Sequence, residues 1–229
     1  MRYKGILLDL DHTLYHYPQK HTKALHAALA LLSKKSGKSY ETCNKHYTLA
    51  REKIHQRLRG TASSHNRLLY FQEACEAMKI NPLRYAYEAS ECYWDNFLKD
   101  LTIYPDMYHF LDLVKEAKIC LITDLTADIQ FRKIRCLQLT KYLDCLVTSE
   151  EAGVEKPHPF IFRLALKKLG LKRQAVAMIG DDFHKDIVGA VKLKIASYWL
   201  NFDQLDSTYK KSPLINECRS FAELIKFFS

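Results

Sequence analysis

Two aspartates stand close together where an apolar stretch near the start of the chain ends. The segment KGILLDLDHTLYHY, residues 4–17, passes through Ile6, Leu7 and Leu8 before it reaches Asp9 and Asp11. Carboxylates this close repel each other, and each raises the other's pKa unless a cation lies between them. The pair therefore raises the question of which cation it holds and what it acts on.

Residues of matching chemistry follow three other short apolar runs. They supply a hydroxyl group, a cation and further carboxylates: Thr123, Asp124, Lys156, Asp181, Asp182 and Asp186. A hard divalent ion with oxygen ligands relieves the repulsion, and Mg²⁺ suits a few carboxylates, water and a phosphate oxygen. The set predicts a Mg²⁺ site that handles a phosphorylated ligand, provided that the fold brings these residues together.

The elements that would position them alternate between strand and helix. Five apolar runs are too short for core helices and fit buried parallel strands: 5–10, 118–123, 145–148, 175–180 and 195–200. Helical segments are expected between the last four strands and before them: 106–117, 126–139, 159–169 and 185–193. This order predicts an α/β fold with a Rossmann-like, doubly wound parallel sheet. In such sheets ligands bind beyond the carboxyl ends of the strands, where these polar residues lie.

Residues 18–100 break this alternation. Apolar residues at helical spacing predict four amphipathic helices, over 25–32, 40–58, 68–78 and 83–97. We therefore expect an α/β core of residues 1–17 and 101–229, with an all-helical domain of residues 18–100 inserted after the first strand. The tail PLINECRSFAELIKFF is expected to form one closing amphipathic helix.

Composition excludes several classes of protein. Of 229 residues, 48% are hydrophobic and 27% charged, which is ordinary for a globular chain with a real core. No apolar run approaches the ~18 residues of a membrane span, and Asp9 and Asp11 interrupt any secretory signal. Seven cysteines without a CxxC pair indicate reduced thiols. We expect a cytoplasmic protein without a membrane partner.

Positive charge is concentrated in one part of the sequence. The net charge is +9, and residues 20–67 hold eleven Lys and Arg side chains against two acids. One interpretation is a solvated basic face, and the other is an electrostatic funnel for an anionic ligand. Nucleic acid is not the expected partner, because neither interleaved aromatic residues nor a nucleic-acid-binding motif accompanies this block.

Four motifs, in order, resemble those of the haloacid dehalogenase-like hydrolase superfamily. They are DLDHTL, LITD, the lysine of EKPHPFIF, and GDDFHKDIVGA. Each follows a predicted strand, and together they extend from residue 5 to about residue 200. The helical insertion resembles the type 1 cap of subfamily I. The resemblance implies a Mg²⁺-dependent hydrolase with a Rossmann-like core.

Residue roles follow from this resemblance together with the chemistry of each side chain. Asp9 fits the nucleophile that forms an aspartyl-phosphate, and Asp11 fits the general acid–base. Asp9, Asp11 (through its backbone carbonyl) and Asp181 are the expected metal ligands. Thr123 is expected to bind phosphate and Lys156 to neutralise its charge. Thr13 is expected to brace the loop by hydrogen bonding.

Some roles stay open on the sequence. Asp124 stands where the family often has asparagine, so it either contributes to phosphate binding or caps the next helix. Asp182 or Asp186 binds the metal directly, binds it through water or holds Lys156, and Asp186 is alternatively a helix cap. In the insertion, we expect four residues to bind a second anionic group of the substrate: Arg51, His55, Arg57 and Arg59.

The predicted function is hydrolysis of a small phosphorylated metabolite, such as a sugar phosphate or a nucleotide, by a Mg²⁺-dependent phosphomonoesterase. One alternative is another hydrolase on the same scaffold, such as a dehalogenase, although the acid at Asp11 argues against it. A second alternative is a non-catalytic module whose basic insertion contacts nucleic acid or an acidic partner.

Overall fold

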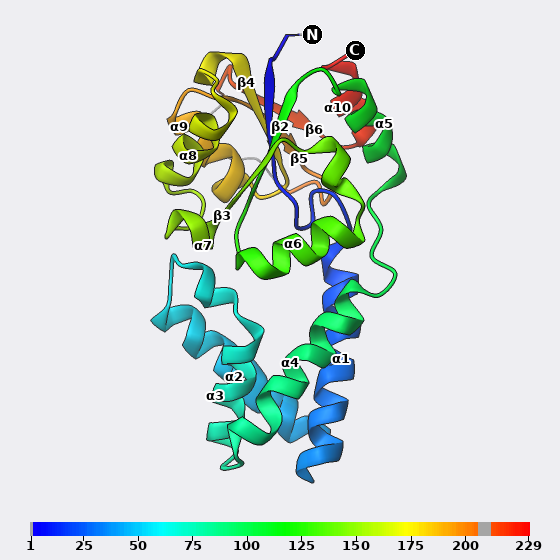
Figure 1. Cartoon of the computed structure of the whole chain (residues 1–229), viewed down its shortest axis with the longest axis vertical. Helices are drawn as coiled ribbons and strands as arrows, with labels where there is room; N and C mark the ends of the chain where they lie inside the picture. Colours follow the sequence, from blue (N-terminus) through cyan, green and yellow to red (C-terminus); the bar gives the residue numbers. More distant parts are fainter. Residues whose placement is uncertain (1, 206–211) are drawn as a thin grey trace. The chain divides into compact units, whose positions relative to one another are not determined.

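The computed structural model describes residues 2–205 and 212–229. They form two compact units (Figure 1). One contains the residues up to His16 and those from Thr102 onward, and we call it the α/β unit. The other, Tyr17–Leu101, is the helical unit. The chain thus leaves the α/β unit after its first strand and returns before its second.

The α/β unit is built on one sheet of six parallel strands. Their order is β3-β2-β1-β4-β5-β6, so β1 lies in the middle between β2 and β4. The strands are β1 (Gly5–Leu8), β2 (Lys118–Thr123), β3 (Cys145–Thr148), β4 (Val176–Gly180), β5 (Ala196–Leu200) and β6 (Ile215–Cys218). All residues of β1 and β4 are buried, which explains why both read as continuous apolar runs. The predicted doubly wound parallel sheet is confirmed.

Helices cover both faces of this sheet, with α8 and α9 on one side and α5 and α10 on the other (Figure 1). Ile161 and Phe162 of α8 pack against Leu7 and Ile122 on the first face, whereas the Phe110 and Phe228 rings meet on the second. The helices of this unit are α5 (Pro105–Leu113), α6 (Ala127–Cys136), α7 (Ser149–Ala152), α8 (Pro159–Leu169), α9 (Gly189–Lys192) and α10 (Phe221–Lys226). Three tighter or wider helical segments complete it: the 3₁₀ segments η2 (Leu139–Tyr142) and η3 (Arg173–Ala175), and the π-helical segment η4 (Phe183–Val188).

Two sequence predictions need correction. The tail is not one helix, because β6 precedes α10. Ser220 caps α10 by accepting a hydrogen bond from the Glu223 amide, while the Glu223 carboxylate accepts one from the Arg219 amide at 2.8 Å. These two bonds favour a helix that starts at Phe221. The predicted helix 185–193 divides into η4 and α9, with the π-helical part at the site described below.

The helical unit contains four helices, as predicted. They are α1 (Tyr17–Ser36), α2 (Tyr40–Arg57), α3 (Arg67–Ala77) and α4 (Pro82–Leu98), with a short 3₁₀ segment, η1 (Ala62–His65), before α3. Polar caps fix where three of them begin. The side chains of Ser39, Asn66 and Asn81 accept hydrogen bonds from amides in the first turns of α2, α3 and α4.

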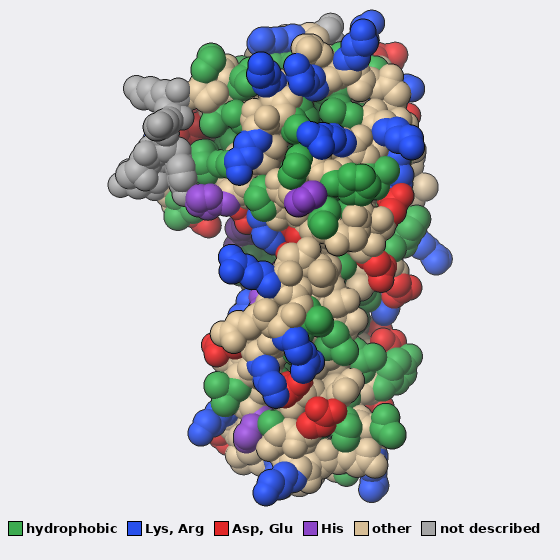
Figure 2. Space-filling view, turned by 90° about the vertical axis from the view of Figure 1, so that its left-hand side faces the viewer, with side chains coloured by type: hydrophobic (Ala, Val, Ile, Leu, Met, Phe, Trp, Pro, Cys, Tyr) green, Lys and Arg blue, Asp and Glu red, His purple; other side chains and the backbone are tan. Residues whose placement is uncertain are grey.

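Lys and Arg side chains are spread over the surface of both units. On the face shown in Figure 2 they are separated by neutral and hydrophobic side chains. Within the described residues, no helix combines the length and the apolar character that crossing a bilayer requires.

Candidate active site

The carboxyl ends of β1, β2 and β4 meet where the strand order reverses. The chain continues from β1 to β2 and β3 on one side, and to β4, β5 and β6 on the other. Asp9 follows β1, and its amide donates to the carbonyl of Ile179 in β4 at 3.0 Å. Thr123 is the last residue of β2, and Asp181 directly follows β4. This reversal is the usual ligand-binding position in open α/β sheets.

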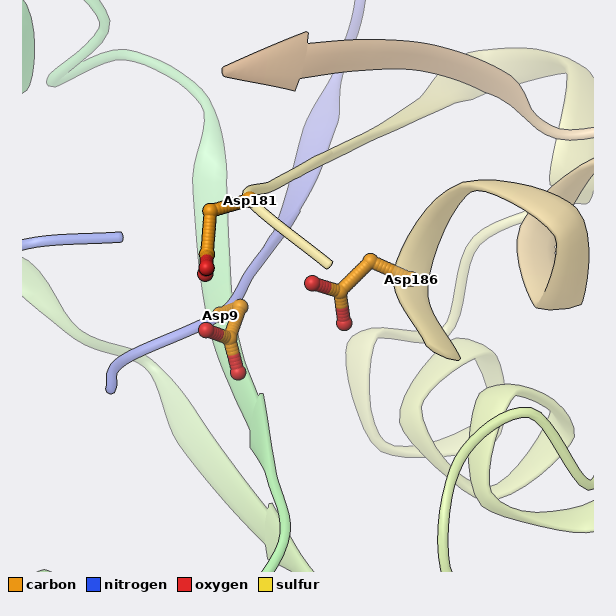
Figure 3. A group of neighbouring side chains, drawn as sticks. All are labelled: Asp9, Asp181 and Asp186. Atoms are coloured by element: carbon orange, nitrogen blue, oxygen red, sulfur yellow. The ribbon is translucent and has the colours of Figure 1, made fainter. Parts of the chain in front are cut away.

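Three carboxylates converge at this point. Oxygen atoms of Asp9, Asp181 and Asp186 lie within 4.8 Å of one another. Figure 3 shows their side chains turned toward a common centre, from the ends of two strands and from η4. Asp9 and Asp186 are buried, and Asp181 is partly exposed. The acids of the first and fourth motifs, far apart in sequence, therefore form one cluster.

Thr13 ties the first motif to the fourth. Its hydroxyl oxygen lies 2.9 Å from Asp9 Oδ2 and 2.7 Å from Asp181 Oδ1, and its single proton bonds one of them at a time. The same oxygen accepts a hydrogen bond from the Asp181 amide at 3.1 Å. Thr13 is fully buried, so it braces the loop as the sequence predicted.

Lys156 is the cation of the cluster. Its Nζ lies 2.5 Å from Asp9 Oδ1 and 2.7 Å from Asp186 Oδ1, and the side chain is buried. Gly180 makes room for this arrangement, because a Cβ atom there would lie 2.2 Å from Asp186 Oδ2. The glycine of GDDFHKD thus allows Asp186 to approach the end of β4 and to pair with Lys156.

One ammonium group does not balance three carboxylates. Burial, reinforced by the Asp9 carboxylate, raises the pKa of Asp181 to about 8. Burial also raises the pKa of Asp9 and of Asp186, although Lys156 opposes both shifts. The Lys156 pKa is itself raised by Asp186 and Asp9, against the effect of burial. The missing positive charge and the all-oxygen donor set fit a hard divalent cation such as Mg²⁺.

Asp11 lies outside the three-carboxylate cluster. Its Oδ1 pairs with Lys133 Nζ at 2.6 Å and accepts the Tyr15 hydroxyl proton, while Oδ2 accepts from Gln130 Nε2 at 3.1 Å. Burial alone would raise the pKa of Asp11, but the Lys133 ammonium and these hydrogen bonds lower it. The two aspartates of DLDHTL, two residues apart, therefore have opposite pKa shifts.

The sequence of residues 3–193 matches the haloacid dehalogenase-like hydrolase family. The chain belongs to this family. It is 35% identical over 190 residues to the ribulose-1,5-bisphosphate 5-phosphatase of Halopiger xanaduensis, covering 81% of this chain and 80% of that protein.

Solved structures share the fold of this haloacid dehalogenase-like hydrolase. A phosphatase of the family from Thermococcus onnurineus superposes with a TM-score of 0.75 at 24% identity, over 98% of this chain and 97% of that one. A 2-haloacid dehalogenase from Pseudomonas syringae also gives a TM-score of 0.75, at 21% identity over 98% and 97% of the two chains. The fold is thus common to phosphatases and dehalogenases.

Two further aspartates of the hydrolase support its backbone. Asp124 Oδ1 accepts a hydrogen bond from the Lys156 amide at 3.0 Å, and Oδ2 pairs with Lys185 Nζ at 2.8 Å. Asp124 does not cap α6, whose N-cap residue is Thr126. Asp182 Oδ1 caps η4 by accepting from the amides of His184 and Lys185, both at 2.9 Å. Of the two open candidates, Asp186 therefore joins the carboxylate cluster and Asp182 does not.

Sequence reasoning missed two polar side chains on α6. Gln130 and Lys133 are fully buried, although the helix carries Ile129 and Ile134 on the same face. Gln130 Nε2 donates to Thr123 Oγ1 at 2.7 Å as well as to Asp11, so it connects the second motif with the first. The sequence did contain a signal for their burial, since a glutamine and a lysine stand three residues apart among the apolar residues of one helix face.

The four candidates in the helical unit have different surroundings. Arg51 and Arg59 are exposed. Arg57 Nη1 lies 3.6 Å from Glu73 Oε2, and His55 Nε2 lies 2.6 Å from the Tyr70 hydroxyl. Arg57 and His55 thus have partners within their own unit.

Proposed function

We propose that this hydrolase is a Mg²⁺-dependent phosphomonoesterase that acts on a small sugar phosphate through an aspartyl-phosphate at Asp9. Membership of the family supports the reaction class. The similarity to a sugar-bisphosphate phosphatase over four-fifths of both chains supports the substrate class. We further propose that residues 1–17 and 101–229 act as the catalytic core and residues 18–100 as a cap that selects the substrate.

The observation that carries this proposal is the separation of two neighbouring carboxylates. Asp9 lies in the cluster with Asp181 and Asp186, whereas Asp11 is held by Lys133 and Gln130. Two carboxylates in different surroundings can take different roles in one reaction. We assign nucleophilic attack to Asp9 and proton transfer to Asp11.

In the first step, an Asp9 oxygen attacks phosphorus and the bond to the ester oxygen breaks. The leaving alkoxide takes a proton from Asp11. A protonated carboxyl group no longer attracts an ammonium group, so protonation of Asp11 and its ion pair with Lys133 exclude each other. Lys133 thus favours the base form of Asp11.

In the second step, Asp11 removes a proton from water as the water oxygen attacks phosphorus. The bond between phosphorus and Asp9 breaks, which releases inorganic phosphate and restores the carboxylate. We assign to Lys156 and Thr123 the role of offsetting charge on the phosphoryl oxygens. The Asp124 carboxylate repels phosphate, so we assign it to holding the Lys156 backbone.

Asp9, Asp181 and Asp186 would hold the Mg²⁺ ion. When bound, this ion supplies positive charge that balances these carboxylates and the phosphoryl oxygens. We also expect the Asp11 backbone carbonyl to be a ligand, as the family motif implies.

A dehalogenase of the same fold is the main rival, because fold similarity alone fits both activities. Carbon–halogen cleavage leaves a halide ion, which needs no proton from a general acid. Phosphomonoester cleavage releases an alkoxide that takes a proton, so it gives the Asp11 carboxyl group a role that halide release does not.

Phosphate release from a library of sugar phosphates, sugar bisphosphates and nucleotides tests the proposal. Wild-type protein is assayed with Mg²⁺ and with a chelator, beside Asp9→Asn and the matched control Asp128→Asn, whose side chain is exposed on α6. We expect turnover only with Mg²⁺, loss in Asp9→Asn and retention in the control. Turnover that survives Asp9→Asn, or halide release without phosphate release, would contradict the proposal.

A further inference from the structure

A buried arginine occupies the start of α3 in the helical unit. Only 5% of Arg67 is exposed. Its Nη1 donates to the His65 carbonyl at 2.6 Å, and its Nη2 donates to the hydroxyls of Tyr17 at 2.5 Å and Tyr93 at 3.3 Å. Three ring centroids lie within 5.6 Å of its Cζ atom: those of Tyr70, Tyr93 and Trp94. The guanidinium group is thus surrounded by aromatic rings and neutral oxygen atoms.

No described residue provides a counter-charge for Arg67. In the described part of the chain, no carboxylate lies within ion-pairing distance of its guanidinium group. Glu73, a buried acid on the same helix, pairs with Lys53 and Arg57 instead. Burying a cation without a partner costs free energy, and proteins usually place an opposite charge or a ligand beside it.

The cluster around Arg67 also has more hydrogen-bond donors than acceptors. Arg67 Nε and the Tyr47 hydroxyl are buried and have no partner among the described residues. The Tyr17 hydroxyl accepts from Arg67, so its own proton has no acceptor among the residues described. Tyr70 differs, since its hydroxyl donates to the Ser64 carbonyl. Because buried donors are nearly always satisfied, two unused buried donors beside an unpaired cation indicate a missing anion.

A second arginine adds to the positive field around Arg67, and a neighbouring histidine responds to both. Burial, with further contributions from Arg67 and Arg51, lowers the pKa of His21 to about 4. His21 is therefore neutral at physiological pH, and its Nδ1 bonds the Tyr93 hydroxyl at 2.8 Å. His21 and Tyr17 are half-buried and their rings stack at 5.6 Å, so the cluster reaches solvent at this point.

We propose that Arg67, Tyr17 and Tyr47 form a binding site for a phosphate group within the helical unit. A phosphate offers several acceptor oxygens to the unused donors and supplies the missing negative charge, and guanidinium groups match its geometry. The anion is either free inorganic phosphate or the non-reacting phosphate of a bisphosphorylated sugar. The second case rests on the proposed function and deepens it, whereas the site itself does not depend on catalysis.

Trp94 provides a local reporter, because the chain has one other tryptophan, Trp199. The test uses a double variant, Trp199→Phe with Asp9→Asn, in the absence of Mg²⁺. This protein is titrated with inorganic phosphate and, separately, with a sugar bisphosphate while Trp94 fluorescence is recorded. We expect a saturable change with at least one of them. We expect Arg67→Lys to weaken binding about thirtyfold or more, since the forked donor is lost.

Tyr47→Phe is the decisive variant. It removes a hydroxyl that makes no hydrogen bond in the structure, so a purely structural role predicts no effect on any ligand. The proposed site predicts about tenfold weaker phosphate binding with an unchanged or higher Tm. Tyr87→Phe, whose ring is exposed on α4, is the matched control and should bind as the background does.

Each outcome decides the proposal. Arg67- and Tyr47-dependent binding of inorganic phosphate assigns the site to free phosphate. The same dependence for the bisphosphate alone assigns it to the second phosphate of a substrate. Two outcomes overturn the proposal. In the first, phosphate binds with the same affinity when Arg67 or Tyr47 is replaced. In the second, the two substitutions weaken the binding of a monocarboxylate such as acetate but not that of phosphate. The binding titration uses the Asp9→Asn protein, which is not expected to hydrolyse the ligand. Absence of hydrolysis by the wild type would therefore refute the proposed function but leave the binding result unchanged.

Discussion

Lys156 in the α/β unit and Arg67 in the helical unit are equally hidden from water, each with 5% of its surface exposed. Their neighbours differ in charge. Lys156 touches the carboxylates of Asp9 and Asp186, whereas Arg67 touches a carbonyl, two hydroxyls and aromatic rings. The first cluster has more negative charge than it can balance, and the second has an unbalanced positive charge.

Opposite imbalances indicate ligands of opposite sign. In the α/β unit, burial and the Asp9 carboxylate raise the pKa of Asp181 to about 8. In the helical unit, burial with Arg67 and Arg51 lowers the pKa of His21 to about 4. Buried charge without a partner is costly in both cases. We therefore regard both imbalances as functional, with Mg²⁺ balancing one and a phosphate group the other.

Replacing Lys156 should have the largest effect. Lys156→Met leaves Asp9 and Asp186 without their shared cation and removes charge stabilisation from the phosphoryl oxygens. We expect kcat for the best phosphomonoester to fall by about 10³-fold or more. Lys167→Met, an exposed lysine on α8, is the control and should retain kcat. A fall of less than about tenfold would show that the Lys156 cluster is structural.

Adding Mg²⁺ should stabilise the protein through the carboxylate cluster. At about one hundred times its Kd, a bound ion contributes about 2.7 kcal/mol, or about 5–10 °C in Tm for a chain of this size. We expect Asp181→Asn to lose most of this shift in a thermal-unfolding assay. Asp182→Asn, which lies outside the cluster, should keep it.

The metal-free protein should also respond to pH. Because the pKa of Asp181 is about 8 in the folded state and near 4 when unfolded, the folded state binds more protons between these values. Stability of the metal-free wild type should therefore fall as pH rises from about 5 to 8. Asp181→Asn should flatten this dependence of the free energy of unfolding on pH. An equally steep dependence in the variant would show that other titratable groups cause it.

Lys133→Met should have an intermediate effect. Lys133 lowers the pKa of Asp11 against burial, so its removal should raise that pKa and move the acid limb of the kcat profile, which reports Asp11 as the base of the second step, to higher pH. We expect about a tenfold loss of kcat at neutral pH for a substrate whose turnover is limited by the second step, with partial rescue in Lys133→Arg. The contribution of the Lys133–Asp11 pair to stability, present above the unfolded pKa of Asp11, should also be lost. A uniform loss at every pH would instead indicate damage to packing.

The residues predicted from sequence are those whose position follows from strand ends. A buried parallel strand gives a continuous apolar run, so its polar successor, such as Asp9 or Asp181, is placed at the sheet edge by topology alone. Lys133 lies within the predicted helix 126–139, and Arg67 lies within the basic block of residues 20–67. Their burial depends on residues that are distant in the sequence and pack against them in the fold, and a local sequence pattern does not identify those residues. The strand β6 was missed because three of its four residues are half-exposed, which blurs the alternation.

The smallest expected effect is on stability in the helical unit. Arg67→Met keeps much of the side-chain volume and removes the unpaired charge, although it also removes three hydrogen bonds. These terms oppose each other, and replacing buried charges by apolar groups is often neutral or stabilising. We expect the free energy of unfolding in urea to change by less than about 1 kcal/mol at neutral pH in phosphate-free buffer. Phosphate should then raise the Tm of the wild type but not of the variant, since only the wild type retains the cation. A loss of about 3 kcal/mol or more without phosphate would mean that the hydroxyls and rings already compensate Arg67, and the contrast with Lys156 would no longer indicate a ligand.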